Sequence, residues 1–330
     1  MRFDFTEDQH EIKRTAKDLL ASRSTLEKVR EAAEAGEYDA ALWKELGELG
    51  WPGVAIDEAH GGGGLGYVEL AGLLEESGYA LLNGPFLATA LCAAAISEAG
   101  SDGQKDEWLG RLASGEATGA FGLVGQVVPD GASADVVVVA DRESGEARLL
   151  TGQGSLEGLD SIDPTRRYGI VEGGLPDGEP MPGDVAAAID LGCVLTSAEL
   201  VGVCGRALDM TVEYVKDRKQ FGRPVGSFQA VQHRCAQMLL STEGARASTY
   251  FAAWAADADR DRLPEAASLA KSAASKAGIE VTASAIQAHG GIGFTWEADV
   301  HWFYKRAQLD AAFLGSSAEH NRRLTALVSP

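Results

Sequence analysis

The sequence from Asp184 onward is dominated by very long helical patterns. One runs from Asp184 through SAELVGVCGRALDMTVEYVKDRK, a second spans FQAVQHRCAQMLLSTEGARASTYFAAWAADA, and a third is PEAASLAKSAASKAGIEVTASAIQAH. Pro264 stands near the start of the third, where the first turn of a helix accepts proline. A fourth begins near ADVHWFYKRAQLDAAF. Long helices joined by short loops pack antiparallel, so residues 184–330 are predicted to form a four-helix bundle.

Two regions of different character precede the bundle. Residues 1–115 have apolar residues at three- and four-residue spacing, as in DAALWKELGELGW, and are predicted to be helical. After them, AFGLVGQVV, ADVVVVADR and ARLLTGQG are short β-branched runs that predict strands, with four valines placed for burial on both faces. The Pro/Gly-rich GGLPDGEPMPGD closes this part as a linker. We therefore predict a mostly α chain with an N-terminal helical domain (1–115), a small, truncated middle β-domain with its linker (116–183) and the bundle (184–330).

The charge of the chain excludes several kinds of partner. There are 49 acidic and 29 basic residues, a formal charge of -20, which repels nucleic acid and anionic membranes. A phosphate-bearing ligand therefore needs local basic residues and backbone amides. No apolar run resembles an uninterrupted membrane span, and acids stand where a signal peptide needs an apolar core, so we expect no membrane insertion and a cytoplasmic location.

Cysteine and histidine spacing gives no sign of a metal site. The four cysteines form no CxxC pair, and the six histidines form no HExxH motif. We predict that the cysteines are small core residues of a protein in a reducing compartment. They are Cys92, Cys193, Cys204 and Cys235.

Three segments carry more specific motifs. KDRKQFGRPVGSFQAVQHR (Lys216–Arg234) joins two of the long helices and contains Arg-x-x-Phe-Gly, and QAHGGIGF ends a third helix with Gln-x-x-Gly-Gly-x-Gly. LWKELGELGWPGVAIDEAHGGGGLGYVELAGLLEESGYAL (Leu42–Leu81) lies in the N-terminal part. Taken alone, each motif has a simpler explanation, because a cation or a glycine pair is also favoured at an ordinary helix C-terminus. In this order and spacing, the set resembles the acyl-CoA dehydrogenase family over nearly the whole chain, least so in the middle domain.

The resemblance implies an FAD whose two halves are held by different subunits. In the family, the flavin ring lies between the middle and C-terminal domains of one subunit, and the ADP half extends to a neighbour that receives it with the two C-terminal motifs. By this match Arg218 contacts the pyrophosphate or adenosine portion, for which guanidinium geometry is suited. The other residues that the match assigns to the cofactor are Phe221, Phe228 and Gln229 on the adenosine side, Gln287 as a nearby hydrogen-bonding group, and Gly290 and Gly291 for close backbone approach.

Acyl-CoA dehydrogenases also need a carboxylate beside the α-carbon of the thioester. In many members this base is a Glu near the C-terminus, and here Leu314 occupies that position. In others it lies on the long helix before Arg-x-x-Phe-Gly, and a gapless count reaches Gly192. Neither Asp190 nor Glu199 is one helical turn from Gly192, and Glu319 is expected to face a partner or solvent, so Asp190 stays only a weak candidate that needs a shifted helix. The catalytic base of this chain is therefore unknown.

The middle domain departs from the family pattern as well. Between Phe121 and Arg167 there is no Trp of the kind that lines the flavin ring, and QVVPDGASAD is only faintly similar to the usual Glu-Pro-x-x-Gly-Ser-Asp segment. In SIDPTRRYG, Arg166 and Arg167 either border a CoA phosphate or belong to an exposed turn, and we favour the turn.

The chain thus resembles the base-lacking subunit of short actinobacterial, heterotetrameric steroid-CoA dehydrogenases. The resemblance implies an α2β2 assembly with a second acyl-CoA dehydrogenase-like subunit that carries the catalytic Glu, an acyl-CoA substrate such as a steroid-CoA, and electron-transfer flavoprotein as acceptor. Two alternatives stay open. One is a homomeric acyl-CoA dehydrogenase with Asp190 as a relocated base, and the other is a non-catalytic CoA-binding scaffold.

Overall fold

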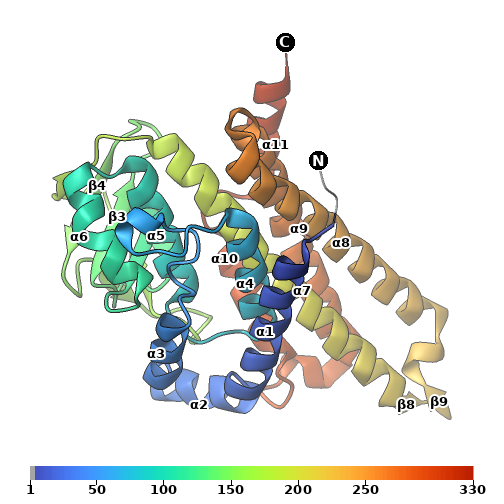
Figure 1. Cartoon of the computed structure of the whole chain (residues 1–330). Coiled ribbons are helices and arrows are strands. Elements are labelled where there is room, and N and C mark those ends of the chain that lie inside the picture. Colours follow the sequence, from blue (N-terminus) through green and yellow to red (C-terminus); the bar gives the residue numbers. More distant parts are fainter. Residues whose placement is uncertain (1–3, 330) are drawn as a thin grey trace.

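The computed structural model describes residues 4–329 and has three parts in chain order (Figure 1). The N-terminal part is helical, as predicted. Thr6 and Ser101 form capping boxes at the first and last of its long helices, which fixes where those helices begin. Its elements are α1 (Glu7–Arg23), α2 (Leu26–Ala35), α3 (Ala40–Glu48), the short 3-10 turn η1 (Glu58–His60), α4 (Tyr67–Tyr79), α5 (Phe86–Ala99) and α6 (Asp102–Ala113).

The middle part consists of two small sheets. In the first, the order is β1-β3-β4-β7, with β1 and β3 parallel and the other pairs antiparallel; in the second, β2-β6-β5 is antiparallel throughout. All five residues of β3 are buried, which confirms the prediction for the valine run. The strands are β1 (Gly119–Leu123), β2 (Val127–Val128), β3 (Val136–Ala140), β4 (Ala147–Thr151), β5 (Glu157–Leu159), β6 (Tyr168–Ile170) and β7 (Glu179–Pro180).

The C-terminal part contains the three predicted long helices, followed by two shorter helices where one was predicted. It comprises α7 (Val185–Asp217), the two-residue strands β8 (Lys219–Gln220) and β9 (Arg223–Pro224), η2 (Val225–Ser227), α8 (Gln229–Ala258), η3 (Arg260–Arg262), α9 (Leu263–His289), η4 (Gly290–Phe294), α10 (Val300–Ala312) and α11 (Ser317–Val328). The mostly α fold with a small β-domain is therefore confirmed. The domain boundaries themselves stay predictions.

Helix α7 is the central helix of the molecule. It has the length and apolar composition of a membrane span, but 94% of its apolar window is buried inside the protein, as in a core helix. It contacts α9, α4, α5, α8 and α10. Its contact with α4 is backbone to backbone, because a Cβ placed on Gly202 would lie 1.9 Å from the carbonyl oxygen of Glu75. This close packing ties the N-terminal helices to the bundle.

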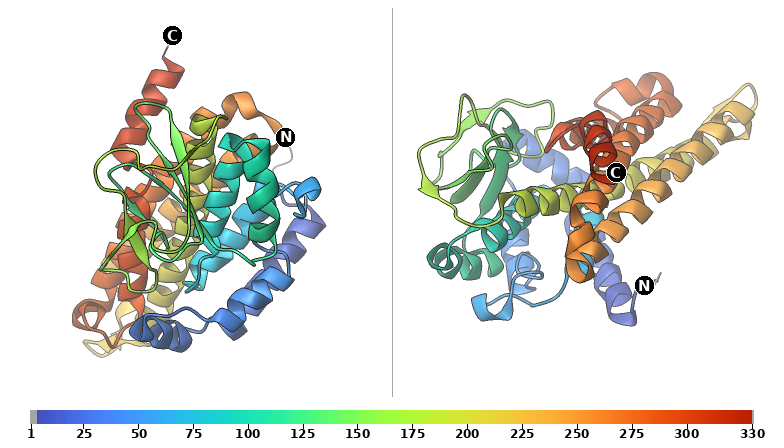
Figure 2. Two further views of the ribbon diagram at one scale, coloured as in Figure 1. Left: turned by 90° about the vertical axis from the view of Figure 1, so that its left-hand side faces the viewer. Right: turned by 90° about the horizontal axis from the view of Figure 1, so that it is seen from above.

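The far end of the bundle projects from the rest of the molecule. The last turns of α7, the β8–β9 hairpin and the start of α8 extend away from the other elements in two views (Figures 1 and 2). Within residues 229–240 of α8, Met238 is the one buried side chain, and Leu239 and Leu240 are exposed. This projecting end carries the Arg-x-x-Phe-Gly motif.

Candidate cofactor-binding site

The β8–β9 hairpin holds Arg218 at the end of α7. The backbone N–H of Arg218 donates to the carbonyl of Tyr214 at 2.9 Å, so Arg218 caps the helix as well as standing in the motif. Phe221 and Gly222 both have left-handed backbone angles, φ 51° and 77°, as a two-residue hairpin turn of type I′ requires. This turn presents the Phe221 ring to solvent with 92% of the residue exposed.

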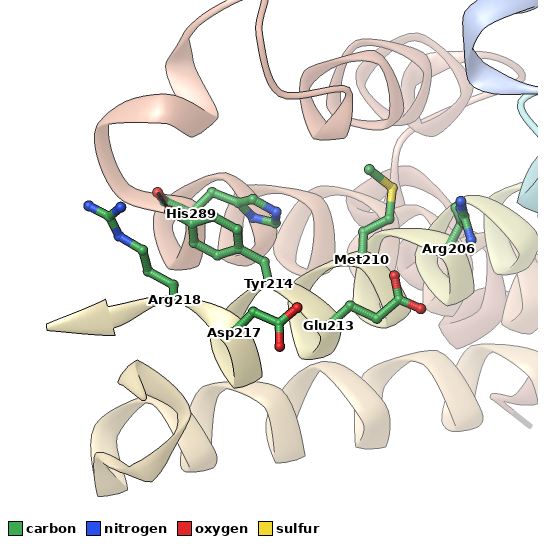
Figure 3. A pocket seen from close by; sticks show the side chains of 7 residues that line it. All are labelled: Arg206, Met210, Glu213, Tyr214, Asp217, Arg218 and His289. Atoms are coloured by element: carbon green, nitrogen blue, oxygen red, sulfur yellow. Dashed lines mark hydrogen bonds between the residues drawn. The ribbon is translucent and has the colours of Figure 1, made fainter. Parts of the chain in front are cut away.

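Arg218 lines an open hollow of about 490 Å³ on one side of α7 (Figure 3). The ring of Tyr214 stacks on that of His289 with centroids 4.4 Å apart, and the Tyr214 hydroxyl donates to the His289 carbonyl at 3.2 Å. These contacts join the end of α7 to the end of α9, where Gln-x-x-Gly-Gly-x-Gly begins. The hollow is lined by Arg206, Met210, Glu213, Tyr214, Asp217, Arg218 and His289.

The charges in this hollow are separated. In Figure 3 the Arg218 guanidinium lies on the His289 side, the carboxylates of Asp217 and Glu213 follow along α7, and the Arg206 guanidinium lies at the opposite end. Burial lowers the pKa of His289, whose Nδ1 lies 2.8 Å from the Ala285 carbonyl, so this ring is neutral at pH 7. Each end of the hollow therefore has a guanidinium that attracts an anionic group, and the two carboxylates between them repel it.

The glycines that follow α9 have two different surroundings. A Cβ placed on Gly293 would lie 2.5 Å from the Ile286 carbonyl, so Gly293 is required by the fold of this chain. A Cβ on Gly290 or Gly291 would meet nothing within 4 Å, and both residues are exposed. Gly290 also has φ 66°, which favours glycine. The packing of this chain therefore gives no reason for Gly291, and it leaves its backbone open to a ligand or partner.

The remaining predicted cofactor residues lie around the hairpin, outside the hollow. Phe228 packs edge-on against Phe221 with centroids 6.1 Å apart, and the Arg223 guanidinium lies 4.1 Å above the Phe228 ring. Gln229 is the first residue of α8, and Gln287 stands near the end of α9; both are exposed. The hollow itself thus contains Arg218 alone of the predicted set.

The two positions where the family places its catalytic acid meet in this structure. Leu314 is fully buried, with φ 57°, and a Cβ placed on Gly192 would lie 2.7 Å from its Cδ1. The same Cβ would lie 3.2 Å from the Phe121 ring of β1. The space beside Gly192 is therefore filled by leucine and phenylalanine, with no carboxylate.

Three side chains hold the backbone of Leu314 in this left-handed conformation. Its N–H donates to Gln126 Oε1 at 3.0 Å, and its carbonyl accepts from Arg142 Nη2 at 2.9 Å. The carbonyl also lies 2.9 Å from His320 Nε2, and burial lowers the pKa of His320 to about 4, so a neutral ring donates here. Gln126 and Arg142 belong to the middle domain and His320 to α11. A left-handed leucine is a strained conformation that only such surroundings maintain.

The acids that the sequence offered as substitutes are engaged elsewhere. Asp190 accepts from Arg323 Nη2 at 2.8 Å and is also contacted by Arg323 Nη1, which ties α7 to α11. Burial raises the pKa of Asp190 while Arg323 opposes the rise. Glu319 closes the capping box of α11 with Ser316. Glu199 is buried in a cluster of charged side chains together with Arg166.

The favoured prediction that Arg166 lies in an exposed turn was wrong, and its buried side chain also does not fit the alternative of a residue that borders a CoA phosphate. Its side chain is 1% exposed and contacts Glu199, and its Nη1 donates to Asp310 Oδ1 at 3.3 Å. The partners come from α7 and α10, far away in the sequence, so the local pattern SIDPTRRYG held no sign of them. Arg167 lies over the Tyr38 ring, 5.5 Å from its centroid.

Sequence reasoning also missed several residues of the site. Tyr214 and His289 build the wall of the hollow, but an aromatic residue and a histidine at helix ends are too common to attract attention. Phe294 and Trp296, 80% and 81% exposed beside the glycine turn, are a readable signal because two large aromatics follow the motif directly. Among residues 4–329, no group of three His, Cys, Asp or Glu side chains is placed to hold a metal ion.

Comparison with known proteins agrees with this architecture. The family model "Acyl-CoA dehydrogenase, N-terminal domain" matches residues 6–116, and "Acyl-CoA dehydrogenase, C-terminal domain" matches 184–326. Acyl-CoA dehydrogenase IpdE2 of Mycolicibacterium smegmatis is 36% identical, over 98% of this chain and 99% of that protein.

Two solved structures of the same fold are also similar. The ChsE4-ChsE5 complex from Mycobacterium tuberculosis contains a chain that is 25% identical with a TM-score of 0.88, covering 100% of both chains. A variant of the Tcur3481-Tcur3483 steroid ACAD is 26% identical with a TM-score of 0.86, covering 98% of both chains. Together with the family matches, these similarities show that the chain belongs to the acyl-CoA dehydrogenase family of flavoprotein oxidoreductases that act on acyl-CoA thioesters.

Proposed function

We propose that this chain is the subunit that lacks the catalytic base in a heteromeric, FAD-dependent acyl-CoA dehydrogenase. The observation that carries the proposal is the contact between Leu314 and Gly192, because it fills both family positions for the catalytic acid with apolar groups. A subunit without an acid contributes to catalysis only if another subunit supplies one. The partner in this proposal carries the catalytic Glu and the flavin-ring pocket.

The cofactor contribution of this chain is the ADP half of the site. The open surface at Gly290 and Gly291 and the guanidinium of Arg218 fit a pyrophosphate that approaches from another chain. Phe221, Phe228, Gln229 and Gln287 are proposed to contact the adenosine side. Because the protein has a charge of -20, binding of an anionic group depends on the Arg218 guanidinium and on the open backbone at Gly290 and Gly291.

The chemistry divides between the two subunits accordingly. FAD, when bound, accepts the hydride that leaves the β-carbon of the thioester. Residues of this chain bind and orient the ADP half, while proton removal from the α-carbon is assigned to the partner's acid. Electron-transfer flavoprotein as acceptor and a cytoplasmic location are parts of the same proposal.

A partner subunit also accounts for the exposed aromatic side chains of the β8–β9 hairpin and of the turn after α9. Phe221, Phe294 and Trp296 are at least 80% exposed, and large aromatics of this kind are typical anchors of protein interfaces. Solved complexes of similar chains, ChsE4-ChsE5 and Tcur3481-Tcur3483, contain two differently named components. By this analogy we propose an α2β2 assembly and a steroid-CoA substrate. The homomeric alternative needs Asp190 to leave Arg323, and no observation favours that.

Arg218→Ala in the co-purified complex tests the proposal. We expect the dissociation constant of FAD to rise about 10–100-fold, since a hydrogen bond to a charged group contributes about 1.5–3 kcal/mol. The dissociation constant of FAD for Arg218→Lys should lie between those of the native complex and Arg218→Ala, because lysine keeps the charge and loses the planar guanidinium. The measurement is flavin absorbance after dialysis against a series of FAD concentrations.

Lys276→Ala on α9 is the control, because it removes one exposed cation that is not among the proposed cofactor residues. Equal flavin retention by Arg218→Ala and Lys276→Ala would contradict the proposal. A complex that binds acyl-CoA but never flavin would instead support the scaffold alternative.

A further inference from the structure

Six charged side chains are buried together where the middle domain meets the bundle. They come from the loops around β2 and β6, from α7 and from α10, and each is at least 93% buried. We call this group the interdomain cluster, and it consists of Asp130, Asp163, Arg166, Glu199, Arg306 and Asp310.

Two guanidinium groups organise the cluster. Arg306 Nε donates to Asp163 Oδ2 at 2.6 Å, and its Nη1 donates to Glu199 Oε1 at 3.4 Å. Arg166 also contacts Glu199, and its Nη1 reaches Asp310 Oδ1 at 3.3 Å. Since Asp163 and Arg166 belong to the middle domain and the other three to the bundle, these contacts fasten one domain to the other.

The charges do not balance if every group is ionised. Four carboxylates face two guanidinium groups, which leaves two negative charges in a site without solvent. Burial of an uncompensated charge is costly, and a buried group of this kind takes up a proton instead. The cluster therefore needs at least one protonated carboxyl at neutral pH.

Three carboxyl oxygens of the cluster could carry that proton. Asp130 Oδ2, Glu199 Oε2 and Asp310 Oδ2 are buried and have no hydrogen-bonding partner. Of these, the Glu199 and Asp310 carboxyls both contact the Arg166 guanidinium and so lie side by side, and hydrogen bonding between them contributes to the shift of each pKa. Carboxylates this close cannot both be ionised, and one shared proton satisfies both groups.

The two carboxyls have unequal surroundings. Glu199 is contacted by both Arg166 and Arg306, whereas Asp310 has only the longer contact to Arg166. Burial raises the pKa of Asp310 well above its usual range, and the neighbouring Glu199 adds to the rise. Burial acts in the same direction on Glu199, but the two guanidinium groups outweigh it and leave its pKa lowered.

We infer that Asp310 is a buried carboxylic acid that donates a hydrogen bond to the Glu199 carboxylate, and that this bond completes an alkali-sensitive latch between the middle domain and the bundle. The latch does not depend on the proposed function. Deprotonation of Asp310 places a second negative charge beside Glu199 and repels α10 from α7. This repulsion disturbs Glu199 and Arg306, which hold Arg166 and Asp163 of the middle domain.

Other titratable groups face the pair and must be held constant. Burial raises the pKa of Asp130 to about 6, while Arg166 opposes the rise. Lys271 Nζ donates to the Asp310 backbone carbonyl at 3.0 Å, and burial lowers its pKa to about 8. Tyr168 donates to Asp163 at 3.0 Å. All of these, together with Arg166 and Arg306, are retained in an Asp310→Asn variant, so their titration cancels when the variant is compared with the native chain.

The test compares the unfolding equilibrium of the full chain with that of Asp310→Asn between pH 5 and 9. The folded native chain keeps a proton that the unfolded chain releases, so its stability falls as pH rises toward the raised pKa of Asp310. Relative to Asp310→Asn, its folding equilibrium constant should fall about tenfold per pH unit above the free aspartate value of about 3.9. A ratio that is constant across this range would overturn the inference.

Two further measurements keep the outcome clear. The infrared carbonyl band of a protonated carboxylic acid should be present in the native chain at pH 8 and missing from Asp310→Asn; its persistence in the variant contradicts the assignment. Glu199→Gln removes the one carboxylate that contacts both guanidinium groups, leaving Arg306 with Asp163 and Arg166 with Asp310, and should destabilise the chain more than Asp310→Asn at pH 7. Equal loss in both variants, or greater loss in Asp310→Asn, also contradicts it.

Discussion

The surface formed by the β8–β9 hairpin and the glycine turn after α9 is open, whereas the contact between Gly192 and Leu314 is closely packed. On the open surface, a Cβ on Gly291 would meet no atom within 4 Å, and three large aromatics are exposed. At Gly192, a Cβ would meet Leu314 at 2.7 Å, and the leucine is fully buried. One region is left open for atoms of another molecule, and the other is closed by the chain itself.

This contrast explains how a chain without a catalytic acid remains useful. The family site has separable parts, a receiving surface for the ADP half of the cofactor and a reacting centre beside the thioester. In the proposed function this chain keeps the receiving surface, while Leu314 is held over Gly192 by Gln126, Arg142 and His320. The following substitutions break or sharpen the contrast, from the largest expected effect to the smallest.

Leu314→Glu restores the family acid at the closed region. We expect the free energy of unfolding to fall by about 3–5 kcal/mol, the cost of an uncompensated buried charge, and no acyl-CoA oxidation by the chain alone. Chemical denaturation and an assay with an artificial electron acceptor measure the two effects. Leu314→Met, which conserves volume, should lose less than about 1.5 kcal/mol. Turnover by the Leu314→Glu chain alone would contradict the account.

Gly192→Ala tests whether Leu314 and Phe121 pack closely against Gly192. The added Cβ must displace Leu314 or Phe121, so we expect a loss of about 1–3 kcal/mol in unfolding free energy. Gly244→Ala is the control, because that helical glycine on α8 has no neighbour within 4 Å and the change should stabilise by up to about 1 kcal/mol. Equal effects of the two changes would show that Gly192 is not closely covered.

Gly291→Ala should have almost no effect on the chain itself. Its added Cβ meets no atom, so the free energy of unfolding should change by less than about 0.5 kcal/mol. In the complex, the same Cβ obstructs the approach of the cofactor, and we expect FAD to bind about tenfold more weakly, as overpacking of about 1–3 kcal/mol implies. Unchanged flavin affinity would remove Gly291 from the cofactor site.

Local patterns were sufficient to predict most of the fold. The ends of α7, α8 and α9 follow from apolar periodicity and from breakers such as Gly290, and the buried strand β3 follows from four consecutive valines. The short strands β5 and β7 were not predictable, because two or three residues held by tertiary pairing leave no periodic signal.

The candidate site was predictable only in its motifs. The sequence identified Gly192 and Leu314 as positions without an acid, but their contact arises from the packing of α7 against the chain that follows α10. The burial of Arg166 depends on Glu199 and Asp310, which are distant along the chain. Pairings of this kind are decided by the tertiary fold, so no local pattern contains them.

The flavin content of purified proteins tests the central claim most directly. The chain expressed alone and the chain co-expressed with its acid-bearing partner are each assayed for FAD per polypeptide by absorbance after denaturation. The account predicts no flavin in the chain alone and one flavin for each pair of different subunits. A full equivalent of FAD in the chain purified alone would contradict it.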